Sequence, residues 1–493
     1  MSTPSLLLAI DAGTSGVRAL VFDRRAAERG SAHEELAIAC PRPGWVETDP
    51  VALWQAARRV MVASLRAAGA AASDVAAVGI ANQRATAVLW EKRSGAPLHD
   101  AIVWQDVRTA ERVAELQRRG VFASTMASST KLEWLLRNVA GAAERARRGE
   151  LCFGTVDSWL AWELTGGRVH ATDASNASCT GLYDYGSGEW DDAILAQLEI
   201  PRSVMPEIVP SSDVIGRTDA AAAGFAAPLA ALAGDQQASM FGLRRHRRGD
   251  FKITFGTSAM VDVNTGITPV LSQHGAYPLV LWQLSSPRLF CLEGSAITAG
   301  AAVQWLRDGL GIVTAASQTS GLATQVEDSG GVWVVPAFQG LGTPYMEPGV
   351  RAMIGGLSRA SGKEQVVRAT LEGISFRCRE IVQALVDDTS GDPPPVLRAD
   401  GGAAENDFLL QHLANTVGVP VERPRTVQGT ALGAAMLAGA AIGFWSTVDE
   451  LDHLWQPQAT FEPVWDASRR ADEVGRWSAR IELAKQSRQS ASA

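Results

Sequence analysis

Hydrophobic and polar positions follow two alternating patterns along the chain. Short apolar runs of strand length, such as residues 6–10, 75–82 and 227–234, are separated by stretches in which apolar residues recur with the spacing of an amphipathic helix. The clearest helix begins after Asp49, a favoured N-cap residue, with Pro50 at its first position. Strands that alternate with helices in this way predict an α/β fold.

One short turn occurs twice in the sequence. LLLAIDAGTSGVRALVFD (6–23) and FKITFGTSAMVDV (251–263) each place Gly-Thr-Ser between two strand-like runs, which predicts two β-hairpins. Each hairpin opens one half of the chain, and the polar stretch LRRHRRGD (243–250) between the halves is typical of a linker. Because a chain of 493 residues exceeds the size of one hydrophobic core, we predict two domains, residues 1–245 and 246–493.

Composition narrows the class of protein. Apolar residues make up 46% of the chain and charged residues 20%, which is typical of a globular protein and excludes a largely disordered one. The net charge is −8 with mixed signs, so a nucleic-acid groove is not expected, and the clusters RARR (145–148) and RRHRR (244–248) indicate solvated loops. The five cysteines form no CxxC pair and the N-terminus does not resemble a signal peptide, which favours a reducing cytoplasm and no zinc site.

One segment is long enough to be tested as a membrane span. TVQGTALGAAMLAGAAIGFWSTV (426–448) carries no charge, but it consists mainly of Ala and Gly instead of Leu and Ile. A tightly packed buried helix explains this composition better than a lipid-facing one. We therefore expect no membrane partner.

The two Gly-Thr-Ser turns are candidate phosphate-binding elements. Glycine lets the backbone approach a ligand, while the hydroxyls and amide N–H groups of the turn are donors for anionic oxygens. A lone GTS tripeptide is most often only a turn, but both copies bridge strands, and the first follows Asp11 at a strand end. Two such hairpins would hold a triphosphate, with Asp11 binding magnesium-coordinated water. The stretch LRADGGAAEND (397–407) predicts either a third nucleotide contact or only a tight strand-to-helix turn.

Other catalytic motifs do not fit the sequence. GGLSRASGKE (355–364) has one residue too many for a Walker loop and has Glu364 where that loop needs Ser or Thr. HExxH is absent, and Val17 stands where GxSxG needs its last glycine.

The stretch AGDQQASMFG (233–242) supplies a candidate catalytic acid. Asp235 ends an apolar strand and begins a helix, where the ordinary role of aspartate is the N-cap. The carboxyl end of a strand is also where open α/β sheets bind ligands, and phosphoryl transfer to an alcohol needs one carboxylate near the hydroxyl. Arg84 and Trp104 would line the other wall, although an ion pair and a core position are the commoner roles of these residue types.

With these residues in view, the chain resembles the FGGY family of carbohydrate kinases, and within it the glycerol kinase branch most closely. The resemblance covers nearly the whole chain and includes both family signatures, MASSTKLEWLLRN (126–138) and AMIGGLSRASGKEQVVRATLE (352–372). It implies an actin-like ATPase fold, in which two ribonuclease-H-like domains enclose ATP, Mg²⁺ and a polyol in a central cleft. It also implies a cytoplasmic enzyme, commonly a homodimer in this family, that phosphorylates a terminal hydroxyl of glycerol or a related small polyol or sugar.

The resemblance assigns a role to each residue that matches a family motif. Asp235 would be the general base, and Asp11 and Asp235 would face the metal. The substrate would contact Arg84, Trp104, Asp106, Asp235 and Gln236. ATP would contact a larger set drawn from both halves: Thr14, Ser15, Arg18, Thr257, Gly300, Gln304, Gly402 and Asn406.

Two positions depart from the glycerol kinase branch. Ala85 stands where that branch has Glu, and Met126 where it has Tyr. Loss of two buried polar partners, each worth about 1–3 kcal/mol, would weaken glycerol binding, and Asp106 resembles the acid of the pentulose kinases. A kinase of a four- or five-carbon polyol or ketopentose is therefore a second hypothesis. A nucleotide-switched actin-like scaffold is a third, which the GDQQ and NQR stretches disfavour.

Overall fold

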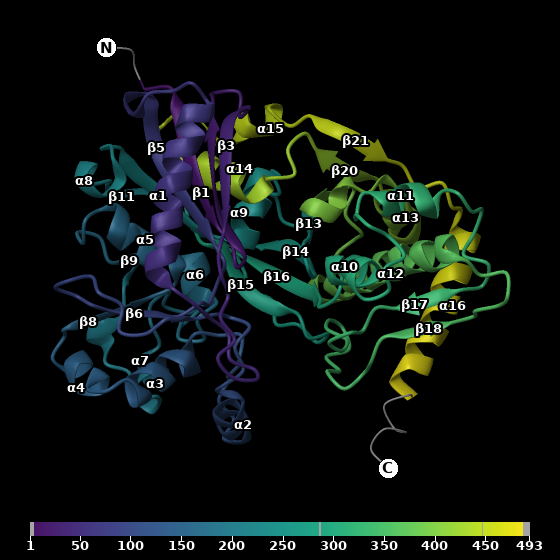
Figure 1. Cartoon of the computed structure of the whole chain (residues 1–493), viewed down its shortest axis with the longest axis horizontal. Coiled ribbons are helices and arrows are strands. Elements are labelled where there is room, and N and C mark those ends of the chain that lie inside the picture. The colour runs from purple at the N-terminus through teal and green to yellow at the C-terminus, as the bar shows by residue number, and fades with distance from the viewer. Residues whose placement is uncertain (1–3, 285–286, 446, 487–493) are drawn as a thin grey trace. The chain divides into compact units, whose positions relative to one another are not determined.

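The computed structural model describes residues 4–284, 287–445 and 447–486. The chain forms two compact units (Figure 1). The first contains Met1–Arg244, Leu279–Leu289 and Thr430–Leu454, and the second contains Arg245–Pro278, Phe290–Gly429 and Trp455–Ala493. Two segments from the later half of the sequence therefore belong to the first unit, which a single boundary near residue 245 does not describe.

A six-stranded sheet forms the centre of the first unit. Its strands are β1 (Leu6–Ala12), β2 (Gly16–Phe22), β3 (Glu28–Glu35), β5 (Val75–Asn82), β11 (Ser212–Arg217) and β12 (Pro228–Gly234), in the order β11-β12-β5-β1-β2-β3. β1 pairs antiparallel with β2, which confirms the first predicted hairpin. β5 runs parallel to β1, and β12 runs parallel to β5. β3 and β11 add antiparallel edges.

Helix α1 (Pro50–Ala67) packs against β2 and β3 and begins as predicted. The Asp49 carboxylate accepts a hydrogen bond from the amide of Val51 at 2.8 Å, and Pro50 needs no such partner because it has no N–H. The buried face of α1, which includes Leu53 and Val60, joins the hydrophobic core formed by the sheet.

The remaining elements of the first unit are shorter. Two small sheets pair β4 (Glu47–Thr48) with β7 (Ala101–Ile102) and β6 (Val88–Glu91) with β8 (Leu151–Gly154), and a third pairs β9 (Ala171–Asp173) with β10 (Glu207–Val209). The helices are α2 (Ala110–Arg118), α3 (Ser129–Asn138), α4 (Ala142–Arg147), α5 (Val156–Leu164), α6 (Ala174–Ser178), α7 (Asp192–Gln197), α8 (Ala220–Ala223), α9 (Asp235–Gly242), α14 (Gly429–Ala441) and α15 (Val448–His453).

The second unit repeats the topology of the first. Its sheet contains β13 (Phe251–Phe255), β14 (Ala259–Gly266), β16 (Leu289–Ala296), β19 (Leu397–Asp400), β20 (Val421–Pro424) and β21 (Pro457–Phe461). The strand order is β15-β16-β14-β13-β19-β20-β21, in which β15 (Tyr277–Trp282) belongs from Leu279 onward to a segment of the first unit. β13 and β14 form the second predicted hairpin, and β19 and then β20 continue the sheet in parallel. β13, β19 and β20 thus take the places of β1, β5 and β12. The expected pair of ribonuclease-H-like α/β domains is confirmed.

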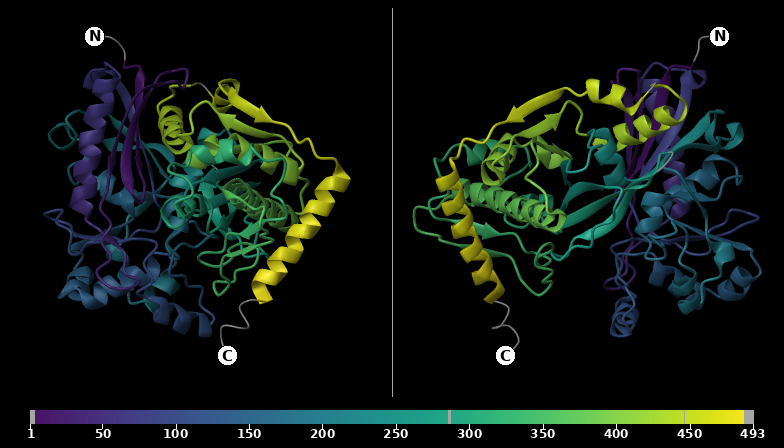
Figure 2. Two further views of the ribbon diagram at one scale, coloured as in Figure 1. Left: turned by 45° about the vertical axis from the view of Figure 1, so that its right-hand side comes forward. Right: turned by 180° about the vertical axis from the view of Figure 1, so that it is seen from behind.

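The long helix α12 (Lys363–Thr389) packs against β14 and α13 (Asp407–Val417) in the second unit. The charged C-terminal helix α16 (Ala467–Gln486) lies at the surface of this unit in both views of Figure 2 and buries an apolar stripe that includes Trp477 and Ile481. The other elements are α10 (Gly300–Asp308), α11 (Gln318–Ala323), β17 (Trp333–Val335) and β18 (Met353–Gly355).

The uncharged segment 426–448 contains α14, which is almost completely buried, as predicted. Gly433 of α14 lies so close to α9 that a Cβ atom would overlap the carbonyl oxygen of Ala238, and a Cβ on Gly79 of β5 would overlap Ala434. These close contacts explain why small residues fill the segment.

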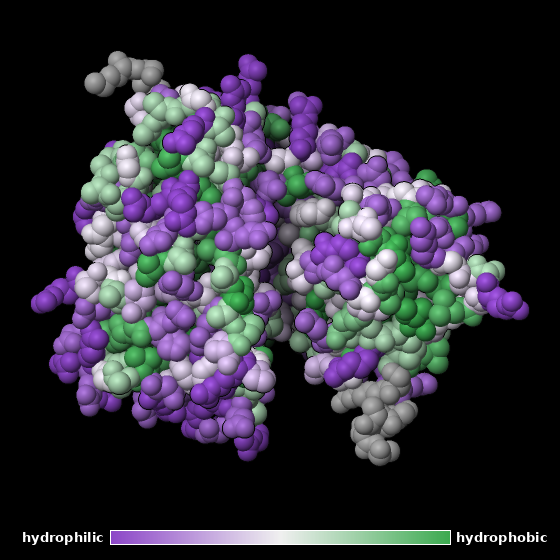
Figure 3. All heavy atoms as spheres, in the orientation of Figure 1, coloured by the Kyte–Doolittle hydropathy of each residue, from purple (hydrophilic) through white to green (hydrophobic). Residues whose placement is uncertain are grey.

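Among the helices of the described ranges, none is both long and apolar enough to cross a bilayer. Hydrophilic side chains are spread over the face shown in Figure 3.

The expectation of solvated loops holds for only part of each basic cluster: Arg147, Arg148, Arg247 and Arg248 are exposed, whereas the other arginines are not. RARR ends α4, where Arg145 pairs with Glu91 at 2.5 Å. In the second cluster Arg244 and Arg245 are each only 5% exposed, and Nε of Arg244 donates to the carbonyl oxygen of Leu451 at 3.1 Å. Arginine tolerates this burial because its stem is apolar and its guanidinium keeps a hydrogen-bond acceptor.

Candidate active site

The parallel strands of the first sheet bring three candidate residues to one edge. Asp11 is the second-last residue of β1, Arg84 follows β5 by two residues, and Asp235 follows β12 directly. Gly234 at the end of β12 is level with Asn82 at the end of β5. Because these strands share one direction, residues distant in sequence meet at their carboxyl ends.

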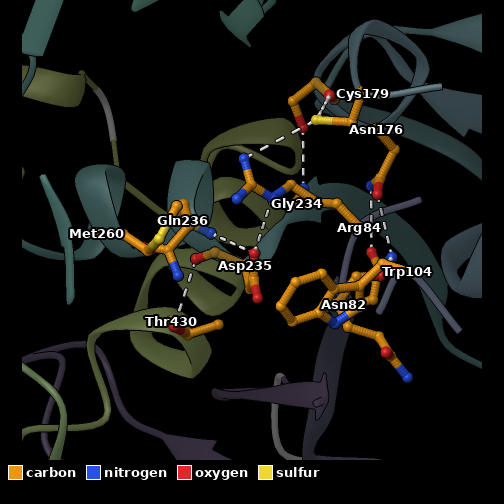
Figure 4. Close-up of polar contacts among 12 residues, drawn as sticks. Asn82, Arg84, Trp104, Asn176, Cys179, Gly234, Asp235, Gln236, Met260 and Thr430 are labelled. Atoms are coloured by element: carbon orange, nitrogen blue, oxygen red, sulfur yellow. Dashed lines mark hydrogen bonds and ion pairs between the residues drawn. The ribbon is translucent and has the colours of Figure 1, made fainter. Parts of the chain in front are cut away.

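Asp235 and Arg84 form an ion pair, with Nε 3.1 Å from Oδ1 and side chains that are 29% and 14% exposed (Figure 4). Asp235 is the first residue of α9 and the N-cap is Gly234, so the N-cap role considered for Asp235 is wrong. Its Oδ1 accepts the amide of Gln236 at 2.8 Å. The carboxylate therefore lies at a helix N-terminus, beside a guanidinium, and stays partly open to solvent.

Gly234 makes room for the side chains around this pair. A Cβ atom at this position would lie 2.5 Å from Oε1 of Gln237 and 2.7 Å from Cδ of Arg84. The amide of Gly234 donates to the hydroxyl of Ser175 at 2.9 Å, which fixes the end of β12. The glycine thus lets the Arg84 stem pass close to the backbone that carries Asp235.

Two buried amides pair at the end of β5, close in sequence to Arg84. The side chains of Asn82 and Asn176 exchange hydrogen bonds of 3.0 and 3.1 Å, as the dashed lines in Figure 4 show. Nη1 of Arg84 lies 3.9 Å from the sulfur of Cys179. The guanidinium thus meets the Cys179 sulfur through Nη1, while its Nε faces Asp235.

A buried acidic network lies beneath α6. Asp173 caps this helix through the amides of Ser175 and Asn176 and accepts the hydroxyl of Ser211 at 2.6 Å. Burial raises the pKa of Asp173, and burial together with the nearby Asp173 raises the pKa of Asp157 to about 6. These acids accept several hydrogen bonds each, so they stabilise the region that supports Arg84 and face no open surface.

Trp104 connects the predicted substrate residues to the first Gly-Thr-Ser turn. Its indole Nε1 donates to the hydroxyl of Thr14 at 2.9 Å, and its backbone amide donates to Thr86 at 3.3 Å. The turn itself closes with a hydrogen bond from the amide of Gly13 to the carbonyl of Gly16 at 2.9 Å. A side chain expected beside the acceptor and one expected beside the phosphates are therefore in direct contact.

Two further candidates, one in the first turn and one on β2, lie at the surface. Ser15 and Arg18 are exposed, and Arg18 on β2 is level with Asp11 on β1. Cross-strand partners lie on the same face of a hairpin, so the turn presents one acid and one base at the strand ends.

The structure keeps Asp106 apart from this group. Its carboxylate has no exposed surface, and it accepts hydrogen bonds from the amide of Val46 at 2.6 Å and from the backbone and guanidinium of Arg108. Arg108 lies over the rings of Trp45 and Trp134, 3.8 and 4.6 Å from their centroids. Asp106 thus holds Arg108 in place in this structure, and the prediction that it contacts substrate remains untested.

Ala85, one of the two departures, has a strained backbone. Its φ is +60°, a conformation that costs a residue other than glycine about 1–2 kcal/mol, and it is 4% exposed. Such strain is common at functional sites, where the surroundings enforce it. The other departure, Met126, is exposed at the loop before α3.

Two residues of this region were not singled out from the sequence. Gln237 is 1% exposed, and neither polar atom of its side chain has a hydrogen-bond partner in the described part of the chain. Lys131 is completely buried beside the backbone of Trp104. In the sequence, Gln237 could have been noticed as the second Gln of GDQQ, and Lys131 as the one lysine of the signature 126–138.

In the second unit, α10 begins directly on the second Gly-Thr-Ser turn. The amide of Gly300 donates to the carbonyl of Gly256, and the amide of Ala301 donates to that of Thr257, both at 3.0 Å. A Cβ on Gly300 would overlap the carbonyl of Gly256. Gly300 is therefore needed for this packing, whatever its role toward a nucleotide.

The other candidate nucleotide residues differ in their surroundings. Gln304 is exposed on α10, and a Cβ on the exposed Gly402 would meet open space. Asn406 caps α13: its Oδ1 accepts the amide of Leu409 and its Nδ2 donates to Thr319, both at 3.0 Å. Gly402 thus offers bare backbone to a ligand, whereas the Asn406 amide is already bound to protein.

Asp11 and Asp235 are the candidate metal residues. They lie at the ends of β1 and β12, two strands apart, which separates their backbones by roughly 10 Å. Across residues 4–284, 287–445 and 447–486, no group of three or more His, Cys, Asp or Glu could hold a metal ion. Two separated carboxylates fit Mg²⁺, which keeps several waters and binds one or two carboxylates, better than a metal enclosed by protein ligands.

Family models match both halves of the chain. Residues 6–242 match the N-terminal domain of the FGGY family of carbohydrate kinases, and residues 251–442 match its C-terminal domain. Each match contains one of the Gly-Thr-Ser hairpins.

Similar proteins are found over the full length of the chain. The chain is 46% identical to the glycerol kinases of Bordetella parapertussis and of Trichlorobacter lovleyi; 98% of this chain is covered in each case, and 98% and 99% of the relatives. Among solved structures, it is similar to the Plasmodium falciparum glycerol kinase with ADP. The TM-score is 0.90 at 29% identity, with 97% of this chain and 98% of that chain covered.

Proposed function

Because the chain belongs to the FGGY family of carbohydrate kinases, we propose that it transfers the γ-phosphoryl group of ATP to a terminal hydroxyl of glycerol. Relatives that are 46% identical over 98% of the chain carry the name glycerol kinase, which supports this acceptor. The observation that carries the proposal is the partly exposed Asp235–Arg84 pair at the end of β12, together with Trp104, whose indole donates to Thr14 of the first turn.

Asp235 is the general base in this proposal. Its carboxylate accepts the proton of the attacking hydroxyl, and the hydroxyl oxygen then forms its bond to the γ-phosphorus as the bond to ADP breaks. Arg84 orients Asp235 and donates hydrogen bonds to substrate oxygens, as does Gln236. The Trp104 ring covers the carbon chain.

Residues of both turns bind the nucleotide in this proposal. Thr14, Ser15 and Arg18 of the first unit and Thr257 of the second donate to phosphate oxygens. Further contacts come from Gly300, Gln304, Gly402 and Asn406. Asp11, with Asp235, would hold a hydrated Mg²⁺, which neutralises phosphate charge when bound.

A substrate panel tests the proposal. ADP release is measured with glycerol, four- and five-carbon polyols and ketopentoses, with Asp235→Asn as the blank. Glycerol should give the highest kcat/KM, and ADP release should depend on the acceptor. If ATP is hydrolysed at the same rate without any acceptor, or not at all with every acceptor, the proposed activity is wrong.

A longer acceptor is the second candidate, and Ala85 and Met126 favour it. The double variant Ala85→Glu, Met126→Tyr restores the two side chains of the glycerol kinase branch. If the natural acceptor is longer than glycerol, this variant should gain about tenfold or more in kcat/KM for glycerol and lose activity toward the longer polyol. If the wild type already prefers glycerol over every longer compound, this alternative fails.

We also propose that the enzyme works in the cytoplasm as a homodimer, which the family resemblance supports; the five cysteines form no disulfide, as expected in a reducing compartment. Sedimentation at micromolar concentration separates a dimer from a monomer. A single species with the mass of one chain, 52.2 kDa, would contradict the dimer.

A further inference from the structure

Lys131 is a completely buried lysine in the first turn of α3. Its ammonium nitrogen lies 2.5 Å from the carbonyl oxygen of Thr125, 3.0 Å from that of Ala127 and 3.4 Å from that of Trp104. Lys131 forms no ion pair within the described ranges. Three backbone carbonyls, and no carboxylate, therefore satisfy a charge that has no access to water.

These three hydrogen bonds join two separate segments of the first unit. Thr125 and Ala127 flank Met126 in the loop before α3, whereas Trp104 follows β7. The indole of Trp104 in turn donates to Thr14 in the first Gly-Thr-Ser turn at 2.9 Å. One ammonium group thus fixes the loop of the first signature against the segment that carries the indole.

Only the protonated form of lysine satisfies all three carbonyls. An ammonium has three N–H donors, whereas a neutral amine has two. A buried carbonyl that loses its donor is costly, so deprotonation would leave at least one of the three carbonyls unsatisfied and weaken the link between the two segments.

We propose that Lys131 is a positioning residue for the acceptor pocket, and that its ammonium sets the spacing between the Trp104 segment and the loop around Met126. The inference rests on the proposed function, because it takes these two segments as walls of the polyol site. Lys131 itself touches neither acceptor nor nucleotide; it acts through the backbone it holds.

The electrostatic surroundings make this device sensitive to pH. Burial lowers the pKa of Lys131 to about 7, with a smaller rise from Asp106 and a smaller decrease from Arg108. On α3 itself, the acid Glu133 pairs with Arg112 and Arg137, at 2.9 and 3.0 Å. The ammonium therefore predominates below pH 7 and the neutral amine above it, so acceptor affinity should weaken gradually as pH rises through this range.

Lys131→Met tests the inference, because it keeps the length of the side chain and removes the donors. The KM for the acceptor should rise about tenfold with kcat within about threefold, the pattern of lost binding without lost chemistry. Between pH 6 and 8.5 the wild-type KM should increase, whereas that of the variant should stay flat. Lys131→Gln, which offers two N–H donors, should lie between them, and Lys92→Met, at an exposed lysine, should match the wild type.

Each result decides one question. An active wild type with the same acceptor KM as Lys131→Met at pH 6.5, or with a KM that does not change with pH, overturns the role of Lys131. A wild type without acceptor-dependent ADP release overturns the proposed function instead. Should Lys131→Met fail to fold by circular dichroism, Lys131→Gln and the wild-type pH profile give the same decision.

Discussion

The two Gly-Thr-Ser hairpins share one topology and differ in where they place charge. In the first hairpin, Asp11 lies two residues before the turn and is level with Arg18 on the partner strand. In the second hairpin, the corresponding pair is Thr254 and Met260. The strands that flank the first turn therefore carry one acidic and one basic residue at their ends, and the strands that flank the second turn carry neither.

The charges of the second hairpin lie inside the sheet. The ammonium of Lys252 is 3.0 Å from the carboxylate of Asp262, and both side chains are buried. Lys252 also donates to the hydroxyl of Thr254, which donates to Asp400 at 2.6 Å. These groups stabilise the strands beneath the turn and are not presented to a ligand.

The strand two places from each hairpin shows the same difference. β12 in the first unit is followed by Asp235, and β20 in the second is followed by the exposed Arg425. A duplicated fold thus supplies two similar turns, and the residues at the strand ends decide which copy has an acid suited to chemistry. We expect the first unit to carry catalysis and the second turn to hold phosphates mainly through its backbone and hydroxyls.

The largest effect is expected at Asp235. Asp235→Asn should lower kcat about a thousandfold, because an amide cannot accept the proton of the hydroxyl. Arg425→Gln, at the corresponding strand end of the second unit, should change kcat less than threefold. Steady-state ADP release measures both, and equal losses in the two variants would remove the proposed difference between the units.

The second-largest effect on activity is expected at Asp11, the residue two positions before the first Gly-Thr-Ser turn; Thr254 is its counterpart before the second turn. Asp11→Asn should lower kcat/KM about a hundredfold and raise the Mg²⁺ concentration needed for half-maximal rate, since the proposed carboxylate ligand is lost. Thr254→Val should lower stability by about 1 kcal/mol, because Lys252 and Asp400 lose a shared partner, and should cost less than tenfold in rate. A Mg²⁺ dependence that shifts in Thr254→Val and not in Asp11→Asn would reverse the assignment.

A smaller effect is expected where α10 meets the second turn. Gly300→Ala would place a Cβ atom against the carbonyl of Gly256, so the helix and the turn must separate. We expect the KM for ATP to rise about tenfold with kcat little changed, on the scale of one overpacked contact. Gly321→Ala on α11, where a Cβ meets open space, is the control. An unchanged KM for ATP in Gly300→Ala would contradict a nucleotide role for this turn.

The smallest effect concerns stability and not activity. Burial lowers the pKa of His412 to about 3, compared with about 6.5 in an unfolded chain. As pH falls below about 6.5, the unfolded chain therefore binds a proton that the folded chain does not, and stability decreases until about pH 3. His412→Phe should remove about 2 kcal/mol of the decrease in unfolding free energy between pH 7.5 and 5, and the exposed His453→Phe should not. Urea titrations at the two pH values measure this, and parallel acid sensitivity in wild type and His412→Phe would refute it.

Much of the fold could be predicted because its signals are local. The apolar runs, the Asp49 cap and the two turns each reflect the conformational preferences of a few neighbouring residues. The Ala- and Gly-rich segment 426–448 was correctly assigned to a buried helix from its composition. Its membership of the first unit depends on packing against Gly79 and α9, which are distant in sequence, and no local pattern encodes that.

The candidate site could be predicted only in part. Asp11, Arg84 and Asp235 follow strands, so their common edge could be expected from parallel topology. The environment of Asp106 could not, because its burial depends on Arg108 and two distant tryptophans. Likewise, the deep burial of Arg244 and Arg245 depends on long-range packing, and composition alone suggested solvent.

The most direct test of the account is a single-turnover reaction of wild type and Asp235→Asn with ATP, Mg²⁺ and glycerol, followed by ³¹P NMR, with glycerol affinity measured separately by calorimetry. Wild type should convert the γ-phosphate into a phosphomonoester, while Asp235→Asn binds glycerol within about tenfold of the wild-type affinity and forms almost no ester. Ester formation by Asp235→Asn at a rate within tenfold of wild type would contradict the assignment of this carboxylate as the base.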